Sequence, residues 1–553
     1  MSKSPEKADA SALKQTARDR VREARGWERV VPVFIHRTEE GVQVVVHWRR
    51  LLLSVFALGA VSVLGLTLAA WVYVYSYKGV KEVGYLHIAL PWRWDEYRVM
   101  RGAHYVATAK EMIATAQWRG AYLNLRVGLL KDPANREGRL LLAQFYGMLR
   151  RFELAEETLM EGLSYHRTDD AYLQAMLQFL LQQQSDARIV TLTGEVLADA
   201  GAGVMRKRIA ALYAATAHAY RGSYDRAEDL IAAHQLGETR EGRMLVARIE
   251  WERGYPELAL IKLEQLRAGL PADDEVAGVL AGYYGELGRV DEARRLNLLR
   301  QVTSPAAPGP RIAMLKLLAK TGDEVAAKRE VEEVMRDFQN DGPALVQLAE
   351  YAANNGDIAL VRRIYEHCKA ADLPWDVVAV LTVEASIVAK QYQDALDLTR
   401  ELLRENPEWS RRHYTLFNGL QAIALHGLGD HDAARLFMKN FLGQANIRSE
   451  QLASVSGRLA AVGAADEARD LLDRAVQDDP LNQAALTKLI ELDLKAGRLE
   501  ELPAAVRKLL TMRKPSPLLL ARVREELGRD RWLFLDGRTA ALDELSAALA
   551  VKP

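Results

Sequence analysis

The feature that most constrains the fold of this chain is a pattern that recurs about every 34 residues from residue 102 onward. Its clearest marker is the residue at the turn between two successive helical segments, and eight of the eleven intervals between these residues are 34 residues long. The turn positions are Ala116, Arg150, Gln184, Gly222, Gly254, Gly288, Gly322, Gly356, Lys390, Gly429, Gly463 and Gly497. A chain of 553 residues would ordinarily form two to four domains, but a repeat array grows without enlarging any single core.

Other residue types also recur at fixed distances from the turn position. Alanine stands five residues after the turn at 121, 155, 227, 259, 293, 327, 395, 434 and 468, and seven residues before it at 109, 143, 215, 247, 281, 349 and 422. Prolines close several units, at 133, 271, 305, 407 and 480. Glycine accepts the left-handed conformation that ends a helix, alanine lets antiparallel helices approach closely, and proline stops the second helix of each pair.

This order of small, aromatic and proline positions resembles the tetratricopeptide repeat (TPR), whose period is also 34 residues. The resemblance covers about residues 102–513 and is strongest from Gly254 to Gly356 and weakest in the repeat that turns at Gln184. It implies an all-α solenoid of about twelve helical hairpins, wound into a right-handed superhelix with a concave inner face. The 38-residue step after Gln184 allows a kink or a break in stacking. Residues 514–553 are expected to cap the array with helices at 517–527 and 540–549.

A second constraint is the run from Leu51 to Tyr77, which holds 27 residues without a charge. This length predicts a transmembrane helix. Trp48 stands at one end, and four aromatic residues between Trp71 and Tyr77 stand at the other, where amphipathic rings favour the membrane interface. The alternatives are a buried core helix and a cleaved signal peptide, and the length of the run argues against both. Residues 78–101 are expected to link the span to the array, with aromatics either at the membrane surface or against the first repeat.

The charge of the flanking segments favours one orientation of the span. Residues 1–50 carry 11 Lys/Arg and 7 Asp/Glu, a net charge of +4, which favours keeping them in the cytoplasm, although the basic residues close to the two membrane edges are equal in number. We therefore expect the N-terminus to be cytoplasmic and the array periplasmic, in a bacterial inner membrane. The single cysteine, Cys368, fits that compartment and excludes an internal disulfide.

The segment before the membrane reads as a charged, mobile tail at residues 1–28 and a β-hairpin at residues 29–48. The hairpin would join runs at 30–35 and 42–47 through a loop at 38–41, with Pro32 confining the first run to an edge. Because an isolated hairpin is marginal in water, it would pair with another chain or a second copy, or rest on the membrane. Gly65 and Ala69 offer a further means of self-association, through close packing of two spans.

In TPR proteins the first helix of each hairpin lines the inner face, and the phase of this sequence selects the residues that would do so here. The partner-binding groove would include Met244, Arg248, Trp251, Ile312, Lys316, Glu350, Glu384, Ile423 and His426, with Gly278, Gly282 and Gly285 between them. Such a small, apolar surface suits an inserted helix or an extended peptide, or else the small residues serve only tight packing. The groove holds Lys316 and Asn354 but lacks the clustered Lys, Asn and Arg set with which some TPR proteins bind a peptide carboxylate.

No catalytic or metal-binding signature stands out. The sequence has no HExxH, GxSxG, P-loop or dinucleotide-binding motif in the required context. His426, Asp430, His431 and Asp432 form one polar group, but the two histidines are five residues apart across a turn, so we expect surface residues and no metal site. Zero net charge, with acids and bases interleaved along the helices, also argues against a nucleic-acid binder.

The sequence therefore predicts a membrane-anchored TPR scaffold for protein–protein interactions in an envelope assembly, with no enzymatic activity, metal or cofactor. The alternative is a peptide-binding chaperone or regulatory receptor that uses the concave groove.

Overall fold

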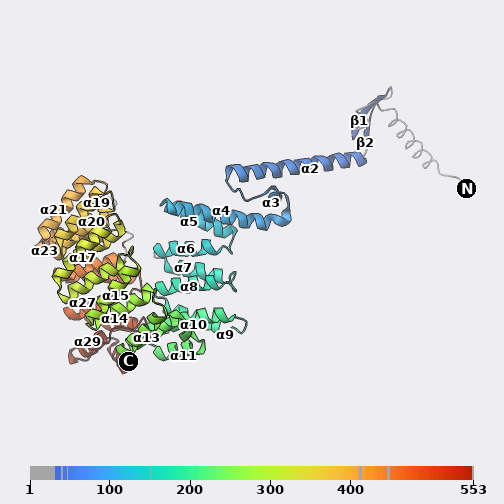
Figure 1. Ribbon diagram of the computed structural model, residues 1–553. Coiled ribbons are helices and arrows are strands. Elements are labelled where there is room, and N and C mark those ends of the chain that lie inside the picture. The colour runs from blue at the N-terminus through green and yellow to red at the C-terminus, as the bar shows by residue number, and fades with distance from the viewer. Residues whose placement is uncertain are drawn as a thin grey trace. The chain divides into compact units, whose positions relative to one another are not determined.

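The computed structural model describes residues 32–38, 41–46, 48–149, 151–409, 414–444, 447 and 449–550. Apart from one short hairpin of strands, every regular element in these ranges is helical (Figure 1). The chain forms two compact units, Met1–His166 and Arg167–Pro553. The charged tail expected at residues 1–28 lies outside the described residues.

The hairpin of strands lies before the long apolar helix. β1 (Val33–Thr38) pairs antiparallel with β2 (Gly41–Val46), with Val33 opposite Val46. The first strand thus begins directly after Pro32, later than the run at 30–35 predicted. A proline before the strand removes no hydrogen bond from the ladder, which explains the shift.

The apolar segment forms one continuous helical element. α2 (Trp48–Val72) continues into a wider π-helical turn, η2 (Tyr73–Tyr77). The chain then reverses at Gly79, whose φ of +71° suits glycine, and forms α3 (Tyr85–Ala89) and the 3₁₀ turn η3 (Pro91–Arg93). The next helix begins at Trp94, ahead of residue 102, where the sequence placed the start of the array.

Twelve helical hairpins follow in the described residues, as the repeat predicts. They are α4 (Trp94–Ala114) with α5 (Trp118–Lys131), α6 (Arg136–Met148) with α7 (Phe152–Leu163), α8 (Asp170–Gln182) with α9 (Asp186–Ala198), α10 (Val204–Tyr220) with α11 (Tyr224–Ala233), α12 (Arg240–Glu252) with α13 (Pro256–Gly269), α14 (Asp274–Glu286) with α15 (Val290–Thr303), α16 (Gly309–Thr321) with α17 (Glu324–Asp337), α18 (Gly342–Asn354) with α19 (Ile358–Ala370), α20 (Trp375–Val388) with α21 (Tyr392–Glu405), α23 (Tyr414–Leu428) with α24 (His431–Leu442), α25 (Ser449–Ala461) with α26 (Ala465–Asp478), and α27 (Gln483–Ala496) with α28 (Leu502–Leu510).

The turn column is confirmed by the backbone. All eight of its glycines have positive φ, between 69° and 90°. The non-glycine members Ala116, Gln184 and Lys390 take the same left-handed conformation, with φ of 56°, 57° and 62°. Arg150, the remaining member, lies outside the described residues. The turn therefore imposes the conformation even where the residue disfavours it.

The extra residues in the 38-residue interval between Gln184 and Gly222 lengthen one helix. α10 has 17 residues, and it packs against both α8 and α9, so the stacking continues through this repeat. The 3₁₀ turn η4 (Leu236–Glu238) follows the short helix α11, where the spacing drops to 32. The change in period thus alters helix length without a break in stacking.

The core of the array is built from the alanine columns and the large side chains around them. Ala215, Ala227, Ala349 and Ala468 are fully or almost fully buried. Cys368 is also buried, and burial raises the pKa of its thiol, as expected for a packing residue. After α28 the chain adds α29 (Pro517–Leu527), the 3₁₀ turn η5 (Asp530–Trp532) and α30 (Arg538–Ala550), which occupy the places expected for the capping helices.

Candidate functional site

The predicted inner-face residues divide into an open and a closed set. Arg248, Lys316 and Glu350 are exposed, and Met244 and Trp251 are half-buried. We refer to α12–α18, which carry these five residues, as the open stretch.

The remaining four residues are largely buried. Ile312 and Ile423 are buried in hydrophobic clusters, His426 is buried, and Glu384 is largely buried in an ion pair. Ile312 therefore belongs to the core, although its neighbour on the same helix face, Lys316, is exposed. The other three lie on α20–α25, which we call the closed stretch.

In the open stretch, aromatic and basic side chains from successive hairpins contact one another. The rings of Trp251 and Tyr283 stack at a centroid distance of 3.8 Å, and the guanidinium of Arg248 lies 4.3 Å from the ring centroid of Tyr220. Burial raises the pKa of the Tyr283 hydroxyl to about 12, so this tyrosine stays neutral at physiological pH. A Cβ added at Gly282 would have no other heavy atom within 4 Å, so the surface beside the stacked rings is accessible.

In the closed stretch, first helices two hairpins apart contact each other. Arg458 on α25 donates a hydrogen bond of 2.8 Å to the carboxylate of Glu384 on α20. This contact is close because α23, which lies between them, carries small residues. A Cβ added at Gly419 would meet the side chain of Val455 on α25 at 3.2 Å. Small residues here therefore serve packing, as in one of the two alternatives that the sequence left open.

The C-terminal end of the array returns to its early repeats within the second unit. Residues 511–516, which we call the closing segment, join α28 to α29 and contact the α8–α9 and α10–α11 turns. Arg513 donates two hydrogen bonds to the carboxylate of Asp186, at 2.8 and 3.1 Å, and one of 2.8 Å to the carbonyl of Leu181. The Asp186 side chain is only 4% exposed, so this pair is a buried contact between residues 327 positions apart.

Lys514 adds a second set of contacts from the closing segment. Its backbone N–H donates to the carbonyl of Tyr220 at 2.7 Å, and its ammonium donates to the hydroxyl of Tyr224 at 3.1 Å. Burial lowers the pKa of the Lys514 ammonium and raises that of Tyr224 to about 12. Because Tyr220 also contacts Arg248, the closing segment adjoins the open stretch.

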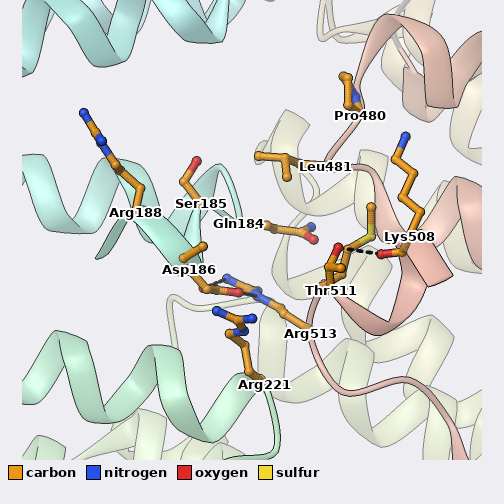
Figure 2. A pocket seen from close by; sticks show the side chains of 12 residues that line it. Gln184, Ser185, Asp186, Arg188, Arg221, Pro480, Leu481, Lys508, Thr511 and Arg513 are labelled. Carbon is orange, nitrogen blue, oxygen red and sulfur yellow. Dashed lines mark hydrogen bonds and ion pairs between the residues drawn. The ribbon is translucent and has the colours of Figure 1, made fainter. Parts of the chain in front are cut away.

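A cavity of about 480 Å³ lies where these parts meet (Figure 2). Its apolar lining comes from Pro480, Leu481 and Met512, and Ser185 adds a hydroxyl. The charged lining residues are Asp186, Arg188, Arg221, Lys508 and Arg513, so four cations and one carboxylate give a net charge of +3. In the described part of the chain, neither Arg221 nor Lys508 has an ion-pair partner, and Figure 2 shows Arg221 extending toward the Asp186–Arg513 pair.

The two histidine side chains of the polar group, His426 and His431, lie closer together than their spacing in the sequence predicted. The Nδ1 atoms of His426 and His431 lie 3.2 Å apart, although the residues belong to different helices. The Nε2 atom of His426 lies 3.6 Å from a carboxylate oxygen of Glu467, beyond hydrogen-bond distance. Burial lowers the pKa of His426. Among the described residues, no group of three or more His, Cys, Asp or Glu side chains is arranged to hold a metal ion.

Comparison with known proteins gives only distant matches. No protein-family model matches the chain, and no curated protein matches it. Among solved structures, yeast Tom70 is 14% identical over 88% of this chain and 96% of its own, with a TM-score of 0.31. PilW, a widely conserved type IV pilus biogenesis factor, is 17% identical over 43% of this chain and 94% of its own, with a TM-score of 0.28. Pseudomonas aeruginosa pilF is 14% identical over 44% of this chain and 95% of its own, with a TM-score of 0.27.

These matches assign neither a partner nor an activity to this chain, and the description of its fold rests on its own helices. Twelve consecutive hairpins, with left-handed turns at the eleven repeat positions that the structure describes, make the chain an all-α, TPR-like repeat array.

Proposed function

We propose that the protein is a membrane-anchored scaffold that holds partner proteins beside a bilayer through its array. The observation that carries this proposal is the 30-residue apolar helix Trp48–Tyr77, because none of the residues in its most apolar 18-residue segment is buried. The twelve hairpins follow this helix along the chain. A soluble protein rarely leaves so large an apolar surface uncovered, and a bilayer covers it at no cost in specific contacts.

In this proposal the N-terminus is cytoplasmic and the array lies in the periplasm of a bacterial inner membrane. The support is the net charge of +4 in residues 1–50, which opposes their transfer across the membrane.

The proposed partner surface combines the open stretch with the cavity beside the closing segment. Met244, Arg248, Trp251, Lys316 and Glu350 remain the candidate contacts on the inner face, because each is at least partly accessible.

The cavity is lined by basic and apolar side chains. Its lining has a net charge of +3, whereas the net charge of the whole chain is zero. This chemistry fits an acidic segment of a partner protein that carries an apolar side chain beside a carboxylate.

The anchor is tested by fractionation and by topology. The full chain should stay in the membrane fraction after carbonate extraction, and a reporter fused after residue 553 should be active only outside the cytoplasm. Extraction into the soluble fraction would contradict the anchor, whereas an active cytoplasmic reporter would contradict only the orientation.

The partner surface is tested by capture of crosslinked proteins from native membranes. Lys508→Glu and Arg221→Glu, at the cavity, should each reduce a captured partner at least tenfold, while Lys439→Glu, an exposed lysine on α24 outside the open stretch, should not. Lys316→Glu separately tests the inner face. Capture that no variant changes would contradict this surface, and the absence of any captured protein with the unmodified chain would contradict the scaffold itself.

The peptide-binding chaperone or receptor is favoured by one observation, the partly exposed Trp251–Tyr283 stack beside Arg248. Stacked rings and a cation form a surface that suits an extended peptide. Trp251→Ser should then abolish binding of unfolded segments without changing the helical content, whereas Lys508→Glu at the cavity should leave that binding intact.

A further inference from the structure

The apolar helix is longer than a bilayer requires. Its 30 residues from Trp48 to Tyr77 measure about 45 Å at 1.5 Å per residue, whereas the hydrocarbon core of a bilayer is about 30 Å thick. About twenty residues are enough to cross it. Counted from Leu51, where the uncharged run begins, twenty residues end at Ala70, so Trp71 to Tyr77 remain.

The segment after the helix folds back onto the end of the helix. We call residues 79–94 the elbow. The hydroxyls of Thr67 on α2 and Tyr85 on α3 lie 2.9 Å apart, and the indole N–H of Trp71 donates to the carbonyl of Val83 at 2.9 Å. The two contacts lie on either side of Ala70, so the elbow covers the helix from about the level at which twenty uncharged residues have been counted.

The elbow has a small core of its own, which fixes it in place. Val74, Val80 and Val83 are buried together, with Ile88 of α3 packed against them. The backbone N–H of Val80 also bonds to the carbonyl of Val74, at 3.2 Å. The fold-back is thus a packed structure and not a loose linker.

The exposed surface of the elbow carries large apolar and aromatic side chains beside the charged Lys81 and Glu82. Leu86, Trp92 and Trp94 are all exposed, Trp92 to 77%. The indole N–H of Trp94 donates to the carbonyl of Ile88, while that of Trp92 has no acceptor among the described residues. A large ring with a free N–H is typical of the headgroup layer of a membrane, where the ring is buried and the N–H is hydrated.

We propose that the hydrocarbon-spanning part of the chain ends near Ala70 and that the elbow lies in the lipid headgroup layer, with Leu86, Trp92 and Trp94 against the lipid. The occupant of this surface is the bilayer itself. The inference rests on the proposed membrane anchor and adds where the span ends and what the elbow contacts. It also places Tyr77 above the hydrocarbon, although the uncharged run extends that far.

The test uses single cysteines in the full chain. Cys368→Ala removes the buried native thiol, and cysteine is then introduced at Leu58, Tyr77, Trp92 or Leu130 and labelled with a nitroxide in phosphatidylcholine nanodiscs. The matched control is Leu130 on α5, which is 77% exposed like Trp92. Collision rates with oxygen, which concentrates in hydrocarbon, and with a water-soluble nickel chelate then report depth.

We expect the label at 58 to report hydrocarbon, the label at 92 the interface, and those at 77 and 130 water. A label at 92 as water-exposed as that at 130, or one at 77 as deep as that at 58, overturns the elbow proposal while the anchor stands. A water-exposed label at 58 overturns the anchor, and the elbow proposal with it.

A second variant tests whether the fold-back sets the depth of the elbow. Tyr85→Phe removes the hydroxyl that meets Thr67 and keeps the ring. We expect the label at 92 to become at least twofold more accessible to the nickel chelate, with no change at 58. An unchanged label at 92 would show that the Thr67–Tyr85 contact does not set the depth of the elbow and would contradict that part of the proposal.

Discussion

Two glycines, Gly282 in the open stretch and Gly419 in the closed stretch, have opposite surroundings. At Gly282 in the open stretch, the space where a side chain would stand is empty. At Gly419 in the closed stretch, the same space is occupied by Val455 and Phe441. The repeat pattern is shared, so the difference comes from how closely the neighbouring helices approach. Small residues on a first helix therefore do not by themselves identify a groove.

The largest expected effect separates the two stretches by burial. Ile423 is 0% exposed, whereas Lys316 is exposed on the corresponding face. Ile423→Asp should lower the free energy of unfolding by about 4 kcal/mol, because it buries an unpaired charge, whereas Lys316→Asp should change it by about 0.5 kcal/mol or less. Chemical unfolding of the full chain in detergent, followed by circular dichroism, measures both. Similar values would abolish the distinction between the stretches.

The second prediction concerns the closing segment, which contacts the α8–α9 and α10–α11 turns. Arg513→Ala leaves the buried Asp186 carboxylate without its cation and should cost about 3 kcal/mol. Hydrogen exchange should then accelerate in α8–α12 and stay unchanged in α20–α25. Lys508→Ala is the control, because its side chain has no ion pair in the described ranges. Uniform acceleration along the array would show that the closing segment does not act locally.

The third prediction compares one ion pair from each stretch. A double-mutant cycle on Glu384 and Arg458, both about one-fifth exposed, should give a coupling energy of about 1–2 kcal/mol. The same cycle on Arg248 and Glu252, which are about half exposed and 4.0 Å apart, should give about 0.3 kcal/mol. Equal couplings would mean that the closed stretch is as hydrated as the open one.

The smallest effect is a pH dependence in the closed stretch. The pKa of His426 is lowered, chiefly by burial and also by His431 and Arg435, while Glu467 opposes the shift. The unfolded chain therefore takes up the proton more readily, and stability should fall as the pH drops below about 6.5. His426→Gln should flatten this part of the stability profile. An unchanged profile would assign the acid sensitivity to other groups.

The sequence predicted the fold well because the repeat is specified by residues that are close together in the sequence. The left-handed turns, the buried alanines and the helix at Pro517–Leu527 each depend on residues a few positions apart. The strand after Pro32 and the helix that begins at Trp94 were misplaced, since each boundary depends on packing as much as on the local pattern.

The candidate site was predicted only in part. Their positions within the repeat placed Arg248 and Ile423 on the same face of the array. Which of the two is exposed depends on the distance between neighbouring hairpins, and the sequence of a single repeat does not determine that distance. The contacts of Arg513 with Asp186 were missed because they join residues 327 positions apart. The one available signal was the polar sequence 511–516 after the last hairpin.

That contact also changes how the array is expected to unfold. A linear solenoid loses its terminal repeats first, because each end has a neighbour on one side only. Where Arg513 and Lys514 join the last hairpin to the α8–α9 and α10–α11 turns, the repeats between them have no free end. Fraying must then begin by breaking a buried ion pair, so these repeats should open together as one cooperative block and not one after another.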